Sequence, residues 1–265
     1  MKNLKIAEIV PTSCLEMTAT HQYHMCLAHL ANKFGDSSRK YTQFYRRMSD
    51  EGKYVLMDNG AAENSQLGFE DLIIAYKAIN PTEIVLPDAL CNSVETIKRT
   101  TQFYDLFKRD ISMYKLMVVP QGNTLEEWCD CALELIDRVP VNSIGVSKFL
   151  EMETGEPDVR VRACEFLKNY SSKTAAVEIH MLGCSEGPHA VRDARNINPM
   201  VRGCDSAFVY ICSKAQIERI DVNTRRLEGE IDFLYDPVNP RLSELMLDFE
   251  TAAGVLHNSC DETWR

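Results

Sequence analysis

Short, continuous apolar stretches recur along the chain, and helix-like segments separate them. Their residues are rich in Val and Ile and do not alternate with polar residues, which is the pattern of strands buried on both faces of a parallel sheet. We therefore predict seven β-strands, at residues 4–10, 54–57, 83–87, 115–120, 143–146, 177–182 and 206–211.

The segments between these stretches have helical signatures. Thr124 stands three residues before Glu127, a capping box that predicts the start of a helix. Pro157 precedes residues 158–170, and proline suits the first turn of a helix. Residues 93–109 are also helix-like, with a predicted buried face made of Val94, Ile97, Thr101, Tyr104 and Leu106.

The spacing of the strands predicts the fold. Strand ends fall near residues 58, 88, 121, 147, 183 and 205, so each interval is about the length of one βα unit. Seven or eight such units in 265 residues match a (β/α)8 TIM barrel of the α/β class, which typically needs about 250 residues. A doubly wound open sheet is the alternative, but no Gly-x-Gly-x-x-Gly follows the first stretch. We predict a single barrel domain over residues 1–265.

Composition narrows the class of protein. No apolar run approaches the ~20 residues of a membrane span, and residues 1–5 do not resemble a signal peptide, so we expect a cytoplasmic protein without a membrane partner. The ten cysteines are scattered, which indicates reduced thiols and predicts no metal site. A net charge of −10 argues against a broad nucleic-acid surface but allows a local one.

Polar residues follow the predicted strands where each strand ends. A single Asp there usually caps a helix or stabilises a turn, as Asp58 could in Asp58-Asn59-Gly60. Three carboxylates on one rim are costly unless a ligand uses them. No lysine at these positions suits a Schiff base, so the predicted chemistry is that of a carboxylate nucleophile or acid and base. The rim residues are Asp58, Asp88, Gln121, 145–147, 180–183 and Asp205.

In this order the strand ends resemble the motifs of the tRNA-guanine transglycosylase superfamily, whose barrels exchange guanine for a 7-deazaguanine. The family motifs are Asp-Ser-Gly-Gly-Phe-Gln, Leu-Asp-Glu, Val-Gln-Gly, Gly-Gly-Leu-Ala, Tyr-Leu-Met-Gly and Phe-Asp-Cys. The matching segments here are Asp58-Asn59-Gly60-Ala61-Ala62-Glu63, Leu86-Pro87-Asp88-Ala89, Val119-Pro120-Gln121-Gly122, Ile144-Gly145-Val146-Ser147, His180-Met181-Leu182-Gly183 and Cys204-Asp205-Ser206.

The resemblance implies a role for each matching residue. Asp205 would be the nucleophile that attacks the sugar C1′, and Asp58 would be the general acid and base. Asp88 would accept hydrogen bonds from the purine, and Gln121 would face its carbonyl edge. The implied base-binding set is completed by Gly145, Val146, His180, Leu182 and Gly183. No cofactor is implied, because the 7-deazaguanine, such as 7-cyano-7-deazaguanine, is itself a substrate.

The chain also departs from the family pattern. Ala62 and Glu63 replace an aromatic residue and a glutamine, and His180 replaces a tyrosine and is alternatively a structural strand histidine. The zinc-binding cysteines that follow the barrel in the tRNA enzymes are missing, and residues 212–265 are expected only to close the barrel. The chain is therefore most similar to compact, zinc-free phage enzymes that modify DNA. Exchange on tRNA or on a nucleoside is the alternative.

The interval 11–53 is longer than one helix needs, so we predict that part of it forms a flap over the rim. Its cations would bind DNA phosphates, and the aromatic residues among them would stack a displaced base. An ordinary outer helix with solvated charges is the alternative. The cations are Arg39, Lys40, Arg46 and Arg47, and the aromatic residues are Tyr41, Phe44 and Tyr45.

Two other classes of protein remain open from the sequence. In a metal-dependent TIM-barrel lyase, the rim carboxylates would hold Mg²⁺ or Mn²⁺. In a non-catalytic binding barrel, Asp205 would be only a turn residue. Base exchange should survive EDTA, whereas the activity of a metal lyase should not.

Overall fold

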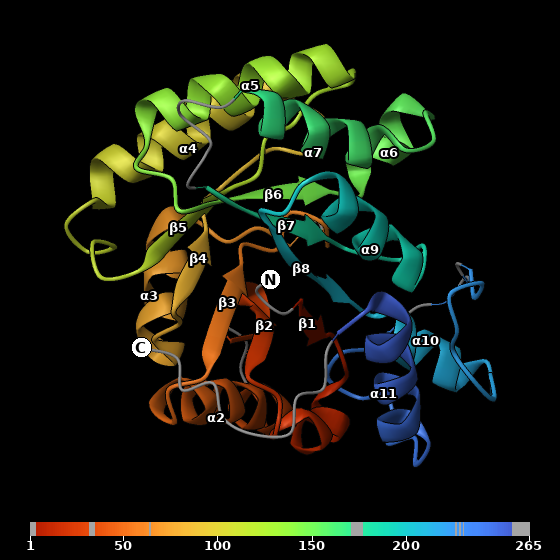
Figure 1. The fold of residues 1–265 in the computed structure, drawn as a ribbon. Coiled ribbons are helices and arrows are strands. Elements are labelled where there is room, and N and C mark those ends of the chain that lie inside the picture. Colours follow the sequence, from red (N-terminus) through yellow and green to blue (C-terminus); the bar gives the residue numbers. More distant parts are fainter. Residues whose placement is uncertain are drawn as a thin grey trace.

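A computed structural model of the protein describes residues 4–31, 35–63, 65–170, 177–225, 227, 229 and 231–255. Within these residues an eight-stranded parallel sheet occupies the centre, and helices surround it (Figure 1). The strands are β1 (Lys5–Glu8), β2 (Tyr23–Leu27), β3 (Tyr54–Asp58), β4 (Glu83–Val85), β5 (Lys115–Val118), β6 (Ser143–Ser147), β7 (Glu178–Leu182) and β8 (Val201–Ser206).

The sheet curls into a nearly closed barrel. Its hydrogen-bonded order is β1-β8-β7-β6-β5-β4-β3-β2, and every ladder is parallel. The end strands β1 and β2 lie side by side, which brings the two edges of the sheet together. This arrangement confirms the predicted single-domain (β/α)8 barrel and excludes the open doubly wound sheet.

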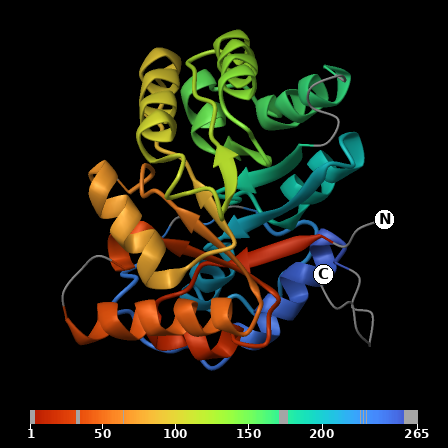
Figure 2. The ribbon, with the colours of Figure 1, turned by 90° about the vertical axis from the view of Figure 1, so that its left-hand side faces the viewer.

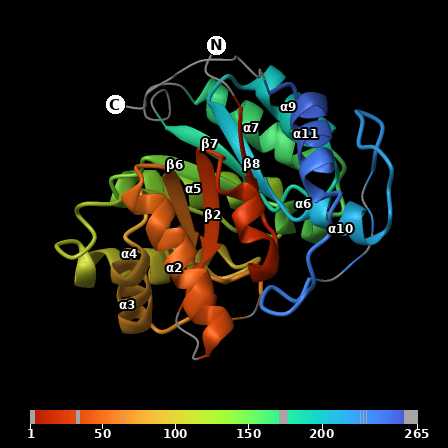
Figure 3. The ribbon, with the colours of Figure 1, turned by 90° about the horizontal axis from the view of Figure 1, so that it is seen from below.

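Helices cover the outside of the barrel (Figures 2 and 3). Apolar side chains of the strands and helices form the core between the two layers, and a smaller apolar cluster fills the barrel interior. The helices are η1 (Thr12–Thr18, a 3₁₀ helix), α1 (Ala28–Ala31), α2 (Asp36–Asp50), α3 (Phe69–Ile79), α4 (Ser93–Phe107), α5 (Leu125–Arg138), α6 (Phe149–Thr154), α7 (Val159–Asn169), α9 (Pro188–Ile197), α10 (Phe208–Lys214) and α11 (Leu242–Ala253). Within the described residues, no helix has the length and apolar character needed to cross a membrane.

The interval 11–53 contains a barrel strand that the sequence pattern did not reveal. The segment Tyr23–Leu27 forms β2, which pairs in parallel with β3, and η1 and α2 are outer helices of the first two units. The described residues of this interval therefore build two ordinary units, and the predicted flap is wrong for them. The strand was missed because Tyr-His-Met-Cys-Leu contains no β-branched residue and carries a histidine.

The predicted strand at 206–211 is also wrong. Strand β8 ends at Ser206, and helix α10 begins two residues later at Phe208. The Ser206 hydroxyl accepts a hydrogen bond from the backbone N–H of Phe208, which stabilises the turn into the helix. An apolar run of this length does not by itself distinguish a buried strand from a buried helix.

The predicted helices are confirmed, but the buried face of one of them is not. At the start of α5, Thr124 accepts a hydrogen bond from Glu127 N–H, as the capping box predicts. In α4 the buried residues are Thr96, Thr100 and Phe103. The predicted face of α4 contains Val94 and Leu106, which are 75% and 62% exposed. The two threonines face the barrel because their hydroxyls donate to the backbone carbonyls of Ala89 and Pro87.

Strand β8 contains an extra residue relative to β7. Ile179 pairs with Val201, but the next residue, His180, pairs with Gly203, so Arg202 is the extra residue of a bulge. Gly203 passes so close to β1 that a Cβ atom there would lie 1.8 Å from the Lys5 carbonyl oxygen. This position therefore accepts only glycine.

The described part of residues 212–265 covers one side of the barrel. Helix α11 packs against α10 and α9 on the side where β8 and β1 meet, as Figure 3 shows. The expected closing role of this segment stays a prediction, and residues 256–265 lie outside the described residues. Glu8 of β1 is buried on this side, and neither of its carboxyl oxygens has a hydrogen-bond partner among the described residues.

Candidate active site

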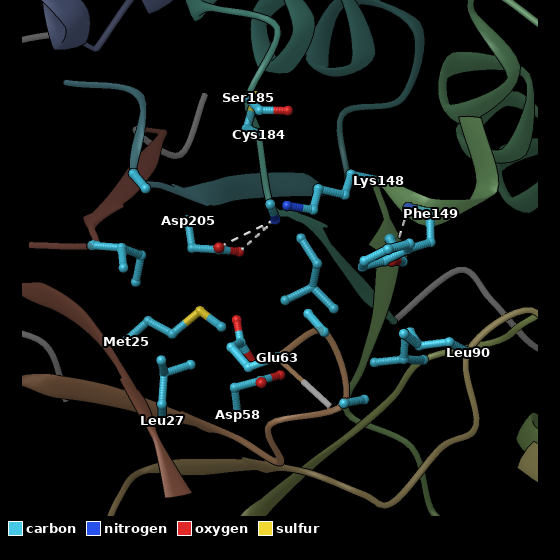
Figure 4. Close-up of a pocket in the computed structure, with 18 of the residues that line it drawn as sticks. Met25, Leu27, Asp58, Glu63, Leu90, Lys148, Phe149, Cys184, Ser185 and Asp205 are labelled. Atoms are coloured by element: carbon cyan, nitrogen blue, oxygen red, sulfur yellow. Dashed lines mark hydrogen bonds between the residues drawn. The ribbon is translucent and has the colours of Figure 1, made fainter. Parts of the chain in front are cut away.

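A pocket with a cavity volume of about 180 Å³ opens at the carboxyl ends of the strands (Figure 4). This is the end of the barrel where parallel-strand barrels place their reacting groups. Seven of the predicted rim residues line it, namely Asp58, Asp88, Gln121, Ser147, Leu182, Gly183 and Asp205. The structure therefore brings together all three predicted carboxylates and the predicted carboxamide.

Asp205 points into this pocket from β8 (Figure 4). The backbone N–H of Gly183 lies 3.0 Å from its Oδ1 and 3.1 Å from its Oδ2. The Nε2 atom of His180 lies 3.1 Å from the same Oδ1. Gly183 supplies its N–H from a left-handed turn at the end of β7, with φ of 65°, a conformation in which glycine is favoured. N–H donors therefore hold the Asp205 carboxylate at the edge of the cavity.

Asp58 is the last residue of β3 and lines the same pocket. Its Oδ2 accepts a hydrogen bond of 2.9 Å from Gly60 N–H, in the tight turn that Asn59-Gly60 predicts. Burial raises the pKa of the Asp58 carboxyl well above its usual value, and the neighbouring Glu63 carboxylate adds to this rise. Asp58 is therefore suited to hold a proton and to donate it to a ligand.

Glu63 is a fourth carboxyl group of the pocket, and Figure 4 shows it beside Asp58. Burial raises the pKa of Glu63, the charge of Asp205 raises it further, and Lys148 lowers it. In the sequence Glu63 is only a departure from the glutamine of the family motif. The structure shows that this departure places a second titratable group next to Asp58.

Asp88 and Gln121 form one hydrogen-bonded unit on the floor of the pocket. Gln121 Nε2 donates to Asp88 Oδ2 at 2.6 Å, and Asn59 Nδ2 donates to Asp88 Oδ1 at 2.8 Å. The other end of the Gln121 carboxamide is fixed as well, because its Oε1 accepts a bond from Cys91 N–H. Burial raises the pKa of Asp88. The two side chains therefore present a rigid polar edge to a ligand.

Three of the predicted base-binding residues do not line the pocket. A Cβ atom at Gly145 would lie 2.4 Å from Leu182 Cδ1, so Gly145 makes room for a pocket side chain and does not touch the pocket itself. Val146 packs in the core outside the barrel, where its carbonyl accepts a bond from Arg160. His180 is completely buried and contacts the pocket only through Asp205.

Lys148 is a pocket residue that the sequence prediction missed. It follows directly after β6, and a Cβ atom at Gly183 would lie 2.9 Å from its Cδ. The expectation that no lysine of the rim suits a Schiff base stays a prediction, although Lys148 lies at one strand end. Among the described residues that line the pocket, Lys148 is the only lysine or arginine. Its position directly after Ser147 at a strand end was the available signal.

Apolar side chains face each other across the cavity. In Figure 4, Met25 and Leu27 lie on one side of the pocket, and Leu90 and Phe149 lie on the other. The first pair comes from β2, the strand that the sequence pattern did not reveal. Two apolar walls around a polar edge form a slot suited to a flat, polar ring. The family motif has an aromatic residue at the position of Ala62. In this pocket Phe149 supplies an aromatic side chain instead.

The four predicted DNA-contacting cations lie on α2, on the outside of the barrel. Arg46 pairs with Asp50 and Arg47 pairs with Glu16, and both pairs are exposed. Arg39 lies near Asp36, and Lys40 is exposed. The aromatic residues between these cations face the core and cannot stack a displaced base, because Tyr41, Phe44 and Tyr45 are all buried.

The described residues contain no group of three His, Cys, Asp or Glu side chains arranged to hold a metal ion. The pocket carboxylates instead face the cavity separately, and three of them, Asp58, Asp88 and Asp205, have side-chain amide or backbone N–H partners. No protein-family model matches the chain, and a search of curated proteins also finds no match.

Proposed function

We propose that the protein is a base-exchange glycosyltransferase that replaces guanine in a polynucleotide by a 7-deazaguanine. The observation that carries this proposal is the arrangement of two different carboxyl groups in one pocket. Asp205 is held by N–H donors, whereas burial and Glu63 raise the pKa of Asp58. A nucleophile and an acid in one site are what the cleavage and re-formation of an N-glycosidic bond require.

In the first step, Asp205 attacks the sugar C1′ and forms a C1′–O bond. The bond between C1′ and the guanine nitrogen breaks, and its electron pair leaves with the base. Protonated Asp58 donates its proton to the departing guanine, which leaves as a neutral molecule. The N–H groups of Gly183 and His180 hold the Asp205 carboxylate during the attack.

In the second step, a 7-deazaguanine takes the place of guanine in the slot. Asp58, now a carboxylate, accepts the proton from the ring N–H of the incoming base. That nitrogen attacks C1′ and forms the new glycosidic bond, while the C1′–O bond to Asp205 breaks and restores its carboxylate. Both carboxyl groups return to their starting states, so the cycle consumes no ATP.

The floor and walls of the pocket suit recognition of the base. Asp88 would accept hydrogen bonds from the N1–H and exocyclic amine of the purine, and Gln121 Nε2 has a second hydrogen for its carbonyl edge. The apolar side chains on the two sides of the slot would contact the faces of the ring. The mutual hydrogen bonds of Asp88 and Gln121 preorganise this edge before the base arrives.

DNA is the polymer favoured by the resemblance to compact phage enzymes, and tRNA or a nucleoside is the alternative. The position of Lys148 supports a sugar-phosphate substrate, because its stem packs on Gly183, the residue that holds Asp205. A cation there would attract the phosphate next to the reacting sugar. The target guanosine would have to leave a base stack to reach the pocket.

The test is incubation of the protein with radiolabelled guanine or 7-cyano-7-deazaguanine and either duplex DNA or tRNA. We expect label to be retained in DNA in the presence of EDTA. Asp205→Ala should abolish retention, and a matched control, Asp193→Ala on the exposed surface of α9, should not. Retention by Asp205→Ala at more than a small fraction of the wild-type rate would exclude Asp205 as the nucleophile.

The second candidate is a metal-dependent lyase. It needs the rim carboxylates to share one ion, and in the described residues they do not form such a group. An activity that EDTA abolishes and Mg²⁺ or Mn²⁺ restores would favour the lyase. If label is retained in tRNA but not in DNA, the proposed base exchange stands and its substrate is tRNA.

A further inference from the structure

His180 lies below the pocket, inside the barrel, and contacts a polar group on each side of its ring. Its Nε2 lies 3.1 Å from Asp205 Oδ1, and its Nδ1 lies 3.2 Å from the hydroxyl of Tyr23. The His180 side chain is fully buried, and Tyr23 is 4% exposed. Both ring nitrogens therefore have a single partner each, and these partners come from β8 and β2, the two strands on either side of β1 in the nearly closed barrel.

The chemistry of the partners determines where the protons lie. Burial lowers the pKa of His180 and raises the pKa of Tyr23 well above its usual value, so the imidazole is neutral and the phenol keeps its proton. The Tyr23 O–H donates to Nδ1, which leaves the ring proton on Nε2. This proton points at the Asp205 carboxylate. The opposite tautomer would place the lone pair of Nε2 against a carboxylate.

Tyr23 is itself held in place. Its ring stacks on that of Tyr54 with a centroid separation of 5.1 Å, and the Tyr54 hydroxyl donates to Glu83. Glu83 forms a buried ion pair with Arg202. A continuous series of polar and aromatic contacts therefore runs through the barrel from Arg202 to Asp205 and fixes the orientation of the Tyr23 hydroxyl.

The two oxygens of Asp205 differ as a result. Oδ1 has two N–H donors, His180 and Gly183, whereas Oδ2 shares only the Gly183 N–H. An oxygen with fewer donors keeps more of its lone-pair density for a reacting carbon. Oδ2 is therefore the oxygen available to attack, provided that Oδ1 stays bound to His180.

We propose that Tyr23 and His180 are positioning residues, which hold Asp205 so that its Oδ2 faces the reacting carbon. This inference rests on the proposed function, in which Asp205 is the nucleophile. Tyr23 acts only through His180, and neither side chain touches the substrate. The proposal assigns a role to a residue of β2. Among the eight barrel strands that the structure describes, only β1 lies farther from Asp205 along the sequence.

The kinetic test uses Tyr23→Phe, which removes one hydroxyl and keeps the stacked ring. We expect kcat for exchange to fall roughly 10- to 100-fold, the range for residues that orient a reacting group, while KM for the base stays unchanged. The matched control is Tyr76→Phe, another buried tyrosine, whose hydroxyl donates to a backbone carbonyl outside the site. The control should retain the wild-type kcat.

A double-mutant cycle separates positioning from simple packing. His180→Gln supplies an amide N–H for Asp205 that does not depend on a tautomer, so adding Tyr23→Phe to it should cause little further loss of kcat. His180→Leu supplies no donor and should be less active than His180→Gln. Full additivity of Tyr23→Phe and His180→Gln would overturn the proposal that Tyr23 acts through His180.

A second measurement does not depend on the reaction. The ¹⁵N NMR shifts of His180 should show the Nε2–H tautomer in the wild type and a mixture of tautomers in Tyr23→Phe. If the wild type shows this tautomer but exchanges no base, the proposed function fails and the positioning of Asp205 stands. A wild-type Nδ1–H tautomer, or identical shifts in both proteins, would overturn the positioning role.

Discussion

Gln121 and Asp88 are joined by a hydrogen bond of 2.6 Å between Nε2 and Oδ2, which determines how the amide group of Gln121 is oriented. Oε1 of the same group accepts a bond from Cys91 N–H, so the carboxamide has a donor and an acceptor partner. Asp88 must then be an acceptor towards Gln121. The polarity of this edge of the pocket is fixed by the pair and does not depend on a ligand.

Asp88→Asn should weaken binding of the purine base. The new amide places a donor where Gln121, Asn59 and the purine all present donors, and each unsatisfied group costs about 1–3 kcal/mol. Calorimetric titration with guanine should show this loss. The control is Asp71→Asn on α3, outside the pocket, which should bind guanine normally. Normal guanine affinity in Asp88→Asn would show that Asp88 does not contact the base.

Glu63→Gln should shift the pH dependence of exchange. The Glu63 charge raises the pKa of Asp58, so its removal lowers that pKa and Asp58 loses its proton at a lower pH. The alkaline limb of the rate profile should therefore move to lower pH. Glu63→Asp, which keeps the charge, should remain closer to the wild type. An alkaline limb that does not move in Glu63→Gln would mean that another group supplies the proton.

Lys148→Met should weaken binding of the polynucleotide without affecting the free base. Loss of one phosphate contact should reduce the slope of log affinity against log salt by about one unit. The comparison variant carries Arg46→Glu and Arg47→Glu on the outer face of α2, where both arginines already have carboxylate partners. We expect its salt dependence to match the wild type. An unchanged salt dependence in Lys148→Met together with a reduced one in the Arg46 and Arg47 variant would indicate that the polynucleotide binds along α2.

Glu8→Met should stabilise the fold at neutral and alkaline pH. Burial, and then Glu250, raise the pKa of Glu8 well above its usual value. The folded state therefore binds this proton more tightly than the unfolded chain, and Glu8 lowers stability as pH rises above about 4.3 towards its folded pKa. Urea unfolding at pH 8 should show a gain of about 1–3 kcal/mol, and the gain should shrink towards pH 4.

The control for this prediction is Glu70→Met on the exposed surface of α3. Surface substitutions of this kind change stability by roughly 0.5 kcal/mol or less, at either pH. A Glu8→Met protein with the same stability as the wild type at pH 8 would show that the buried carboxyl group carries no penalty.

The sequence alone could predict which side chains share the rim. Parallel strands end on one side of a barrel, so Asp58, Asp88, Gln121 and Asp205 had to converge once the strands had been located. The depth of a side chain along the barrel axis is harder to predict. His180 and Leu182 both point inwards from β7, but only the second reaches the pocket. Two residues along a strand correspond to about 6.6 Å, which is enough to move a side chain out of the site.

Other parts of the site could not be predicted because their signals are weak or non-local. β2 has no β-branched residues, so Met25 and Leu27 were not placed in a wall of the pocket. The partnership of Tyr23 with His180 depends on closure of the barrel, which brings together residues 157 positions apart. Neither hydropathy nor motif spacing carries that information.

The bulge in β8 changes which residues of the strand face the barrel axis. In a regular strand the inward-facing residues would be all even-numbered or all odd-numbered. Here Arg202 and Asp205 both face inwards, three positions apart, because Arg202 is itself the extra residue of the bulge. Deletion of Arg202 would place Gly203 directly after Val201 and restore regular alternation, so Asp205 would still face inwards and only the buried arginine would be lost. A search for strictly alternating inner residues would therefore detect either the buried arginine or the pocket aspartate of this strand, but never both.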